Sequence, residues 1–158
     1  MKRTVEYKGI NRIEKRAIEA LAILPIIEMV SQKIGRDAAR AILKEVNQKE
    51  AYQRGQSMMK EQNVIDELVK EVATWGEGGT WEMDILEKTS TTYFFNVLRC
   101  PYYEKYKELG LEEFGVELSC CRDEPFARGL NPKLKLVRTK TIMEGEDRCD
   151  FRYFLHSQ

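Results

Sequence analysis

The stretch Arg138–Tyr153, RTKTIMEGEDRCDFRY, carries two runs of β-forming residues on either side of an acidic turn that contains a glycine. This pattern predicts a hairpin, because β-branched and aromatic residues favour strands and glycine favours the turn between them. The two strands are expected at Lys133–Met143 and Cys149–Leu155, joined across EGED. Because the second strand opens on a cysteine beside a carboxylate, the hairpin is also a candidate wall of a functional site.

The amino-terminal half of the chain has the spacing of helices. Between residues 10 and 34, apolar side chains recur every three or four positions, and Pro25 should kink or divide this helix. A second helix is expected up to about Tyr52. A third helix is expected across Asn63–Trp75, and the glycines that follow it should end it.

After those glycines the spacing changes to that of strands. WEMDILEK at Trp81–Lys88 alternates apolar and acidic residues and predicts a half-buried strand, and TTYFFNVL at Thr91–Leu98 predicts a second one. Helices are then expected at Pro101–Leu109, where proline suits the first position, and at Leu111–Arg128, with an interruption near Pro125.

These elements predict an α+β fold, in which amino-terminal helices are followed by an antiparallel sheet of about four strands in ββααββ order. The 158 residues fit a single domain, with a helical part at 1–78 and an α+β part at 79–158 that carries the candidate site.

The composition excludes some classes of partner. Lys+Arg and Asp+Glu are equal at 26 each, so no net charge draws the chain to nucleic acid or to an anionic membrane. The longest apolar run, near Leu21–Ile27, contains a proline and is too short to span a bilayer. The first residues lack the apolar core of an export signal, so we expect a cytoplasmic protein whose cysteines are thiols or metal ligands.

Four cysteines, Cys100, Cys120, Cys121 and Cys149, are the first candidates for chemistry. The plainer alternative is that they are buried as small hydrophobic residues, since no pair has the short spacing typical of zinc ligands. Cys100 is expected between a strand and a helix, where the helix amino terminus lowers a thiol pKa. One of Cys120 and Cys121 should face inward, because neighbours on a helix diverge by about 100°.

Charged side chains near the cysteines are the second set of candidates. Arg138 and Arg152 lie on the two strands of the expected hairpin, where a guanidinium can hold both oxygens of a carboxylate. Their pairing with Asp147 or Asp150 on a solvated face is the simpler alternative. His156 is near the carboxyl end and is expected to be solvated rather than catalytic.

Two segments, RCPYYEKYKELG and SCCRDEPFARGLNPKLKLVRTKTIMEGEDRCDFRY, resemble the L-2-amino-thiazoline-4-carboxylic acid hydrolase family. The resemblance covers about Thr92–Tyr153. It is carried by CPY at Cys100–Tyr102, GLNPK at Gly129–Lys133, RTKT at Arg138–Thr141 and CDFRY at Cys149–Tyr153. It implies the hydrolytic opening of a cyclic amidine to an N-carbamoyl amino acid, N-carbamoyl-L-cysteine in the family's named activity.

A more distant similarity links the end of the chain to small-molecule-binding domains of the 4-vinyl reductase type, in which cysteines and a carboxylate can hold zinc. In that pattern a further cysteine would stand where this chain has Thr141. The resemblance therefore implies either no cofactor or a zinc ion on three ligands, Cys100, Cys121 and Cys149. Such an ion keeps an open position and lowers the pKa of bound water to about 7.

These observations lead to a hydrolase hypothesis, in which water or a thiolate attacks the ring of a small-molecule substrate. The candidate catalytic residues are Cys100, Cys121, Cys149, Asp123 and Asp147, and the candidate substrate-binding residues are Arg138, Arg152 and Asn131. The competing hypothesis is a non-catalytic small-molecule-binding or sensor domain, which dimerises with a second copy through its amino-terminal helices. In a third hypothesis, the cysteines are only packed in the core as small hydrophobic residues and form no site.

Overall fold

The computed structural model describes residues 9–156. Its helices are α1 (Arg12–Ile34), α2 (Arg36–Ser57), α3 (Val64–Ala73), α4 (Pro101–Glu108), α5 (Gly115–Leu118) and α6 (Asp123–Leu130). Its strands are β1 (Glu82–Lys88), β2 (Thr92–Arg99), β3 (Leu134–Val137) and β4 (Cys149–Leu155). Three short 3₁₀ turns are η1 (Glu112–Phe114), η2 (Cys120–Arg122) and η3 (Ile142–Glu144).

The fold is α+β with a four-stranded antiparallel sheet, as the sequence predicts. The order ββααββ does not describe the chain, because three helices precede the first strand and α4, α5 and α6 separate β2 from β3. The expected single helix at 111–128 is broken at Ser119, where the backbone leaves the helical region (φ −130°, ψ −64°). Pro125 does not interrupt α6, because it lies in the first turn, where no backbone hydrogen bond is lost.

The strands follow the order β1-β2-β4-β3, so that β2 and β4 form the centre of the sheet. Alternate residues of these strands face the helices: Phe95 pairs with Phe151, and Val97 pairs with Cys149. The rings of Phe95 and Phe151 stack with centroids 4.8 Å apart, and Trp75 of the helical half packs on Phe151 at 5.7 Å. Cys149 is therefore buried on the covered face, at the end of the sheet where β2 finishes.

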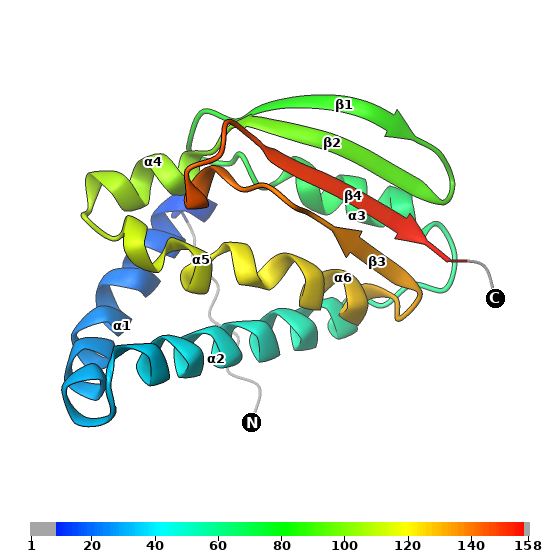
Figure 1. Cartoon of the computed structure of the whole chain (residues 1–158). Helices are drawn as coiled ribbons and strands as arrows, with labels where there is room; N and C mark the ends of the chain where they lie inside the picture. Colours follow the sequence, from blue (N-terminus) through cyan, green and yellow to red (C-terminus); the bar gives the residue numbers. More distant parts are fainter. Residues whose placement is uncertain (1–8, 157–158) are drawn as a thin grey trace.

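The helices lie on one side of the sheet, and α6 lies between β3 and the long helix α2 (Figure 1). Two glycines allow this close packing. A Cβ atom on Gly55 of α2 would clash with the backbone of α6, and one on Gly129 of α6 would clash with the backbone of α2. Since α6 begins at Asp123, this helix contact also fixes the position of a candidate site residue.

The hairpin differs from its prediction on the first strand. β3 ends at Val137 rather than at Met143, and 3₁₀ turn η3 replaces its continuation. The carboxylate of Asp150 accepts hydrogen bonds from the backbone N–H groups of Thr139 (2.8 Å) and Lys140 (2.6 Å). These bonds take the place of the strand ladder, so the chain turns and Arg138 can point toward the helices.

The structure narrows one further prediction and corrects another. Of the two outcomes expected at Pro25, a kink or a division, the division does not occur, because α1 continues through Pro25 as one helix. β1 is an exposed edge strand rather than a half-buried one: Ile85 is 53% exposed, beside an irregularity in the pairing with β2. No helix within residues 9–156 is long and apolar enough to cross a membrane.

Candidate functional site

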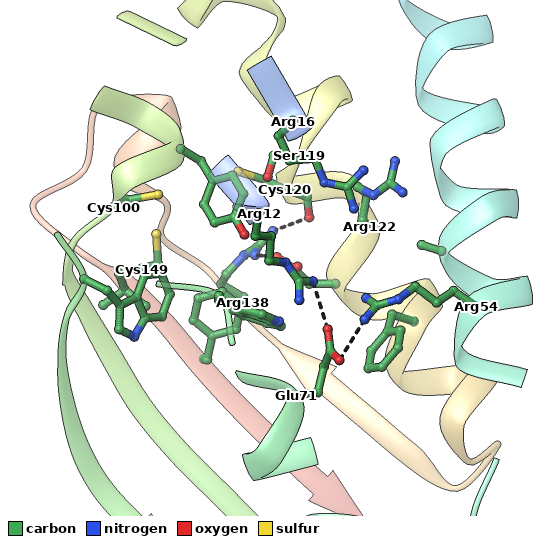
Figure 2. Close-up of a pocket in the computed structure, with 18 residues that line it drawn as sticks. Arg12, Arg16, Arg54, Glu71, Cys100, Ser119, Cys120, Arg122, Arg138 and Cys149 are labelled. Carbon is green, nitrogen blue, oxygen red and sulfur yellow. Dashed lines mark hydrogen bonds and ion pairs between the residues drawn. The ribbon is translucent and has the colours of Figure 1, made fainter. Parts of the chain in front are cut away.

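A cavity, here called the central pocket, lies between the helices and the covered face of the sheet (Figure 2). Its wall takes side chains from α1, α2, α3, α4, α6 and η2 and from strands β2 and β4. Its volume is about 80 Å³, which is room for several water molecules or for one small molecule. The helical half and the sheet-bearing half of the chain therefore both contribute to one site.

Three thiols line the central pocket: those of Cys100, Cys120 and Cys149. Cys100 stands between β2 and α4, as predicted, Cys120 opens η2, and Cys149 opens β4. Figure 2 shows the sulfur atoms of Cys100 and Cys149 directed toward each other. The strand-to-helix junction and the start of the hairpin strand thus bring two of the three predicted cysteines to the same place.

Burial decides the protonation of these thiols. It raises the pKa of Cys149 to about 12, and it raises that of Cys120 well above its usual value. The pKa of Cys100 is also raised, because burial outweighs the backbone N–H groups of Tyr103 and Tyr102 at the start of α4. The prediction of a lowered Cys100 pKa is therefore wrong, and the three thiols are protonated at neutral pH.

Cys121 does not line the central pocket. Its sulfur lies 3.1 Å from the backbone oxygen of Glu117 and 3.9 Å from that of Lys44 in α2, and burial raises its pKa to about 12. Neighbours in a 3₁₀ turn with about three residues per turn point in widely different directions, so only one of two adjacent cysteines can face the pocket. That residue is Cys120.

The residues present do not fit the zinc ion that the distant similarity implied. Within residues 9–156, no group of three or more His, Cys, Asp or Glu side chains could hold a metal ion. Thr141, at the position of the missing cysteine, has a structural role, because its hydroxyl accepts from the backbone N–H of Glu144 and caps η3. The backbone N–H of Ile142 donates to the sulfur of Cys149 at 3.3 Å.

Asp123 and Arg138 form a mostly buried ion pair in the central pocket. The guanidinium of Arg138 also donates to the backbone oxygen of Cys120 at 3.0 Å and lies 4.9 Å from the ring centroid of Phe151. Burial raises the pKa of the Asp123 carboxyl, and the positive charge of Arg138 opposes this shift. Asp123 therefore accepts a proton more readily than a surface aspartate does.

A second ion-pair group lies at the helical end of the pocket. Glu71 of α3 is bonded to Arg12 of α1 and to Arg54 of α2, both at 2.8 Å (Figure 2). The Glu71 side chain is only 5% exposed. Burial favours its neutral form, but the hydrogen bonds and charges of the two arginines prevail and lower its pKa. The carboxylate is ionised and ties three helices together.

Sequence reasoning missed the charged pocket residues of the helical half and of η2. These are Arg12, Arg16, Arg54, Glu71 and Arg122. One signal was available: Glu71 follows Val64 by seven positions and Leu68 by three, so it falls on the apolar stripe of its helix. Another was the pair Arg12 and Arg16, since like charges four residues apart on a helix destabilise it unless something compensates.

Three predicted site residues lie outside the central pocket. Asp147 is 63% exposed and pairs with Arg148 at 2.7 Å. Arg152 donates to backbone oxygens of β2 and β4 from the uncovered face of the sheet. Asn131 donates to the backbone oxygen of Lys60 at 2.9 Å and shapes the turn after α6. In the structure, these three residues form a surface ion pair or hydrogen bonds to the backbone, and none of them contributes to the pocket wall.

The pocket is cationic, although the chain as a whole has no net charge. Five arginines line it against two carboxylates, an excess of three positive charges among the lining residues. Neutral thiols and aromatic rings form most of the rest of its wall, together with Ala51, Val97 and Ser119. Such a pocket can bind a small anion and offers one carboxylate, Asp123, for proton transfer.

The fold and the site together define an α+β protein with a cationic, thiol-lined pocket between its helices and its sheet. The sequence model of the L-2-amino-thiazoline-4-carboxylic acid hydrolase family matches residues 15–153. The chain belongs to this family, and the match includes the helical half that sequence inspection left outside the resemblance. Among curated proteins, none matches the chain significantly.

Proposed function

We propose that this chain hydrolyses a small cyclic amidine that carries a carboxylate, and opens the ring to an N-carbamoyl amino acid. The family name supplies the first substrate to test, L-2-amino-thiazoline-4-carboxylate. Its ring-opened product is N-carbamoyl-L-cysteine. The observation that carries the proposal is the Asp123–Arg138 pair in a pocket with an excess of arginine side chains.

In the proposed reaction, water adds to the ring carbon that is bonded to two nitrogens and to the sulfur. One proton of this water passes through Asp123 to the ring nitrogen. The bond from that carbon to sulfur then breaks, a carbonyl forms, and the hydroxyl proton passes to the leaving sulfur. The product therefore contains one water more than the substrate and carries a free thiol.

Asp123 suits this role because of its surroundings. Arg138 engages its Oδ2 atom, and no residue of the described chain bonds its Oδ1 atom, which leaves that oxygen for a water molecule or the substrate. Because burial raises the pKa of each pocket thiol, water rather than a thiolate is the attacking group in this proposal. Arg138 holds the carboxylate of Asp123 in place.

The test is an assay of the purified chain with L-2-amino-thiazoline-4-carboxylate, and with its D enantiomer as a control. Ring opening is followed by thiol release and by mass spectrometry of the product. The variant Asp123→Asn should lower kcat by about 10²- to 10⁴-fold, which is the usual contribution of a proton-transfer residue. Because Asp123 acts as a base, activity should fall as the pH drops through its raised pKa.

The matched control is Asp147→Asn, which alters an exposed carboxylate outside the pocket and should leave kcat within a few-fold of the parent chain. If Asp123→Asn keeps full activity, Asp123 is not the proton carrier. If the parent chain turns over neither enantiomer, the hydrolase proposal is wrong.

A second candidate function is non-catalytic binding of a small carboxylate. The observation that favours it is the protonated state of the pocket thiols, which leaves no activated nucleophile among them. In this case the ligand raises the melting temperature without any thiol release, so the same preparation separates the two functions.

A further inference from the structure

We propose that Arg12, Arg16 and Arg122 form a receptor for the carboxylate of the bound small molecule, and that Arg138 does not bind it. This deepens the proposed function, because it rests on that function for the identity of the ligand. The receptor itself is argued from charge and geometry. Its three guanidinium groups come from α1 and η2, two parts of the chain that sequence reasoning did not connect.

All three arginines line the central pocket, and Arg12 and Arg16 lie near enough to Arg122 for their charges to act on it. Arg12 and Arg16 are one helical turn apart on α1, and Arg122 is the last residue of η2. All three line the pocket and are mostly buried (Figure 2). Ser119, which precedes the thiol of Cys120, lies among them in the pocket wall.

Each guanidinium is anchored on one side. Arg12 donates to Thr74 at 2.6 Å as well as to Glu71, so its orientation is fixed from α3 and the segment after it. Arg16 pairs with Glu19 at 2.6 Å, and Arg122 pairs with Glu50 and donates to the side-chain oxygen of Asn47, both in α2. A guanidinium has five N–H donors, so these anchors leave donors for a ligand in the pocket.

The anchors neutralise the cluster only in part, since the buried carboxylate of Glu71 is shared between Arg12 and Arg54. Glu19 and Glu50 are 41% and 54% exposed, and ion pairs with such exposed carboxylates are screened by water. Burial together with the charges of Arg16 and Arg12 lowers the pKa of Arg122 to about 10. Three like charges held close together in a mostly buried place are relieved by an anion between them.

Arg138 is unsuited to this role because its contacts are already made. Asp123, the backbone oxygen of Cys120 and the ring of Phe151 surround its guanidinium. It is a positioning residue for Asp123. One further donor is free: the indole N–H of Trp81, which also lines the pocket, is buried and has no partner among residues 9–156.

The arrangement fixes the direction of the ligand. A carboxylate at the arginine cluster leaves the rest of a small ring within the same cavity as Asp123, Cys100 and Cys149. Recognition should therefore depend on the carboxylate, and the same ring without it should bind weakly.

Tryptophan fluorescence gives a direct measurement. The chain has two tryptophans, Trp75 and Trp81, and both line the central pocket. Titration with L-2-amino-thiazoline-4-carboxylate should change their emission at much lower concentration than titration with 2-amino-thiazoline, which lacks the carboxylate. The variants Arg16→Gln and Arg122→Gln should each raise Kd for the carboxylate by roughly 10- to 100-fold. Neither should weaken the binding of the ring that lacks the carboxylate.

The control is Arg128→Gln, which removes an exposed arginine of α6 that does not line the pocket and should leave both affinities unchanged. Arg16→Lys keeps the charge but loses the fork of donors, and should bind with intermediate affinity. This milder variant tests the receptor even if a glutamine variant fails to fold. If the ligand is turned over, these arginine variants should lower kcat/KM mainly by raising KM rather than by lowering kcat.

Failure of this inference is distinguishable from failure of the proposed function. Binding of the carboxylate that depends on Arg16 and Arg122, without thiol release, overturns hydrolysis and supports the receptor. Equal affinity for the two rings, or unchanged affinity in Arg16→Gln, Arg16→Lys and Arg122→Gln, overturns the receptor even when the parent chain hydrolyses its substrate.

Discussion

Cys149 shows how burial governs chemistry at the level of one residue. Its thiol faces Cys100 in the central pocket and accepts a hydrogen bond from a backbone N–H, which favours a thiolate. Burial has the larger effect and raises its pKa to about 12. A cysteine in a polar pocket is therefore not automatically a nucleophile, since the thiolate is the reactive form.

We predict that Cys149 reacts slowly with iodoacetamide near neutral pH. Because its pKa is raised to about 12, very little of the thiol is ionised, so alkylation should be roughly 100-fold or more slower than in the urea-unfolded chain. Peptide mapping by mass spectrometry gives the rate at this residue. The rate should increase as the pH rises. Alkylation as fast as in the unfolded chain would restore Cys149 as a candidate nucleophile.

The residue scale also shows why only part of the site could be predicted. Cys100 and Cys149 were found because their places at element boundaries can be read from the local sequence. Cys120 and Cys121 could not be distinguished, because a 3₁₀ turn rather than an α-helix orients them. Arg16 resembles any solvated helix charge until the folded chain places η2 beside it.

At the level of elements, Glu71 fixes α3 to α1 and α2. We predict that Glu71→Gln destabilises the fold by about 2 to 4 kcal/mol near neutral pH, because it leaves two arginine charges without their shared carboxylate. The measurement is urea unfolding. The control on the same helix is Glu67→Gln, whose partner Lys70 is exposed, and its effect should be much smaller.

The same ion pairs predict a pH dependence. The folded-state pKa of Glu71 lies below its usual value of 4.5, so its contribution to stability is complete above that pH. The contribution is lost as the pH falls through the lowered pKa. The stability difference between the parent chain and Glu71→Gln should therefore shrink on acidification. A difference that stays constant would show that the ionised carboxylate is not its source.

The contact of α2 with α6 transmits helix packing to the site. We predict that Gly129→Ala destabilises the fold by about 1 to 3 kcal/mol, since the added methyl group would overlap the backbone of α2 near Tyr52. It should also lower turnover, because α6 begins at Asp123 and must shift. Gln53→Ala on the exposed face of α2 is the control. Unchanged stability in Gly129→Ala would mean that the two helices can separate without cost.

The elements themselves were predictable where local preference and tertiary environment agree. β2 and β4 were recognised because they are rich in aromatic and β-branched residues, which favour strands, and alternate residues of both strands are buried in the sheet. The end of β3 was not predicted, because it depends on the side chain of Asp150, more than ten residues further along the chain. The exposure of β1 likewise depends on its place at the edge.

For the whole molecule, the central question is whether the helical part at 1–78 and the α+β part at 79–158 fold separately. Two buried ion-pair groups lie within one part each, Glu71 with its arginines in the first and Asp123 with Arg138 in the second. Other ion pairs join the two parts, among them Arg122–Glu50 and Arg40–Glu117. The core also joins them. Trp75 packs on Phe151, and Gly55 of α2 contacts the backbone of α6.

We predict that neither part folds alone. Fragment 79–158 would expose the face of the sheet that carries Phe95 and Phe151. A chain of about 80 residues buries a smaller fraction of its surface on folding than a longer chain does, so it cannot lose this contact and remain stable. Each fragment, expressed separately, should lack cooperative urea unfolding by circular dichroism, whereas the full chain should unfold in one transition. Mixing the two fragments serves as the complementation control and should restore part of the structure. A cooperative transition in fragment 79–158 alone would instead make the helices a separate unit, and the arginine cluster would then be brought to the site by domain docking rather than by folding.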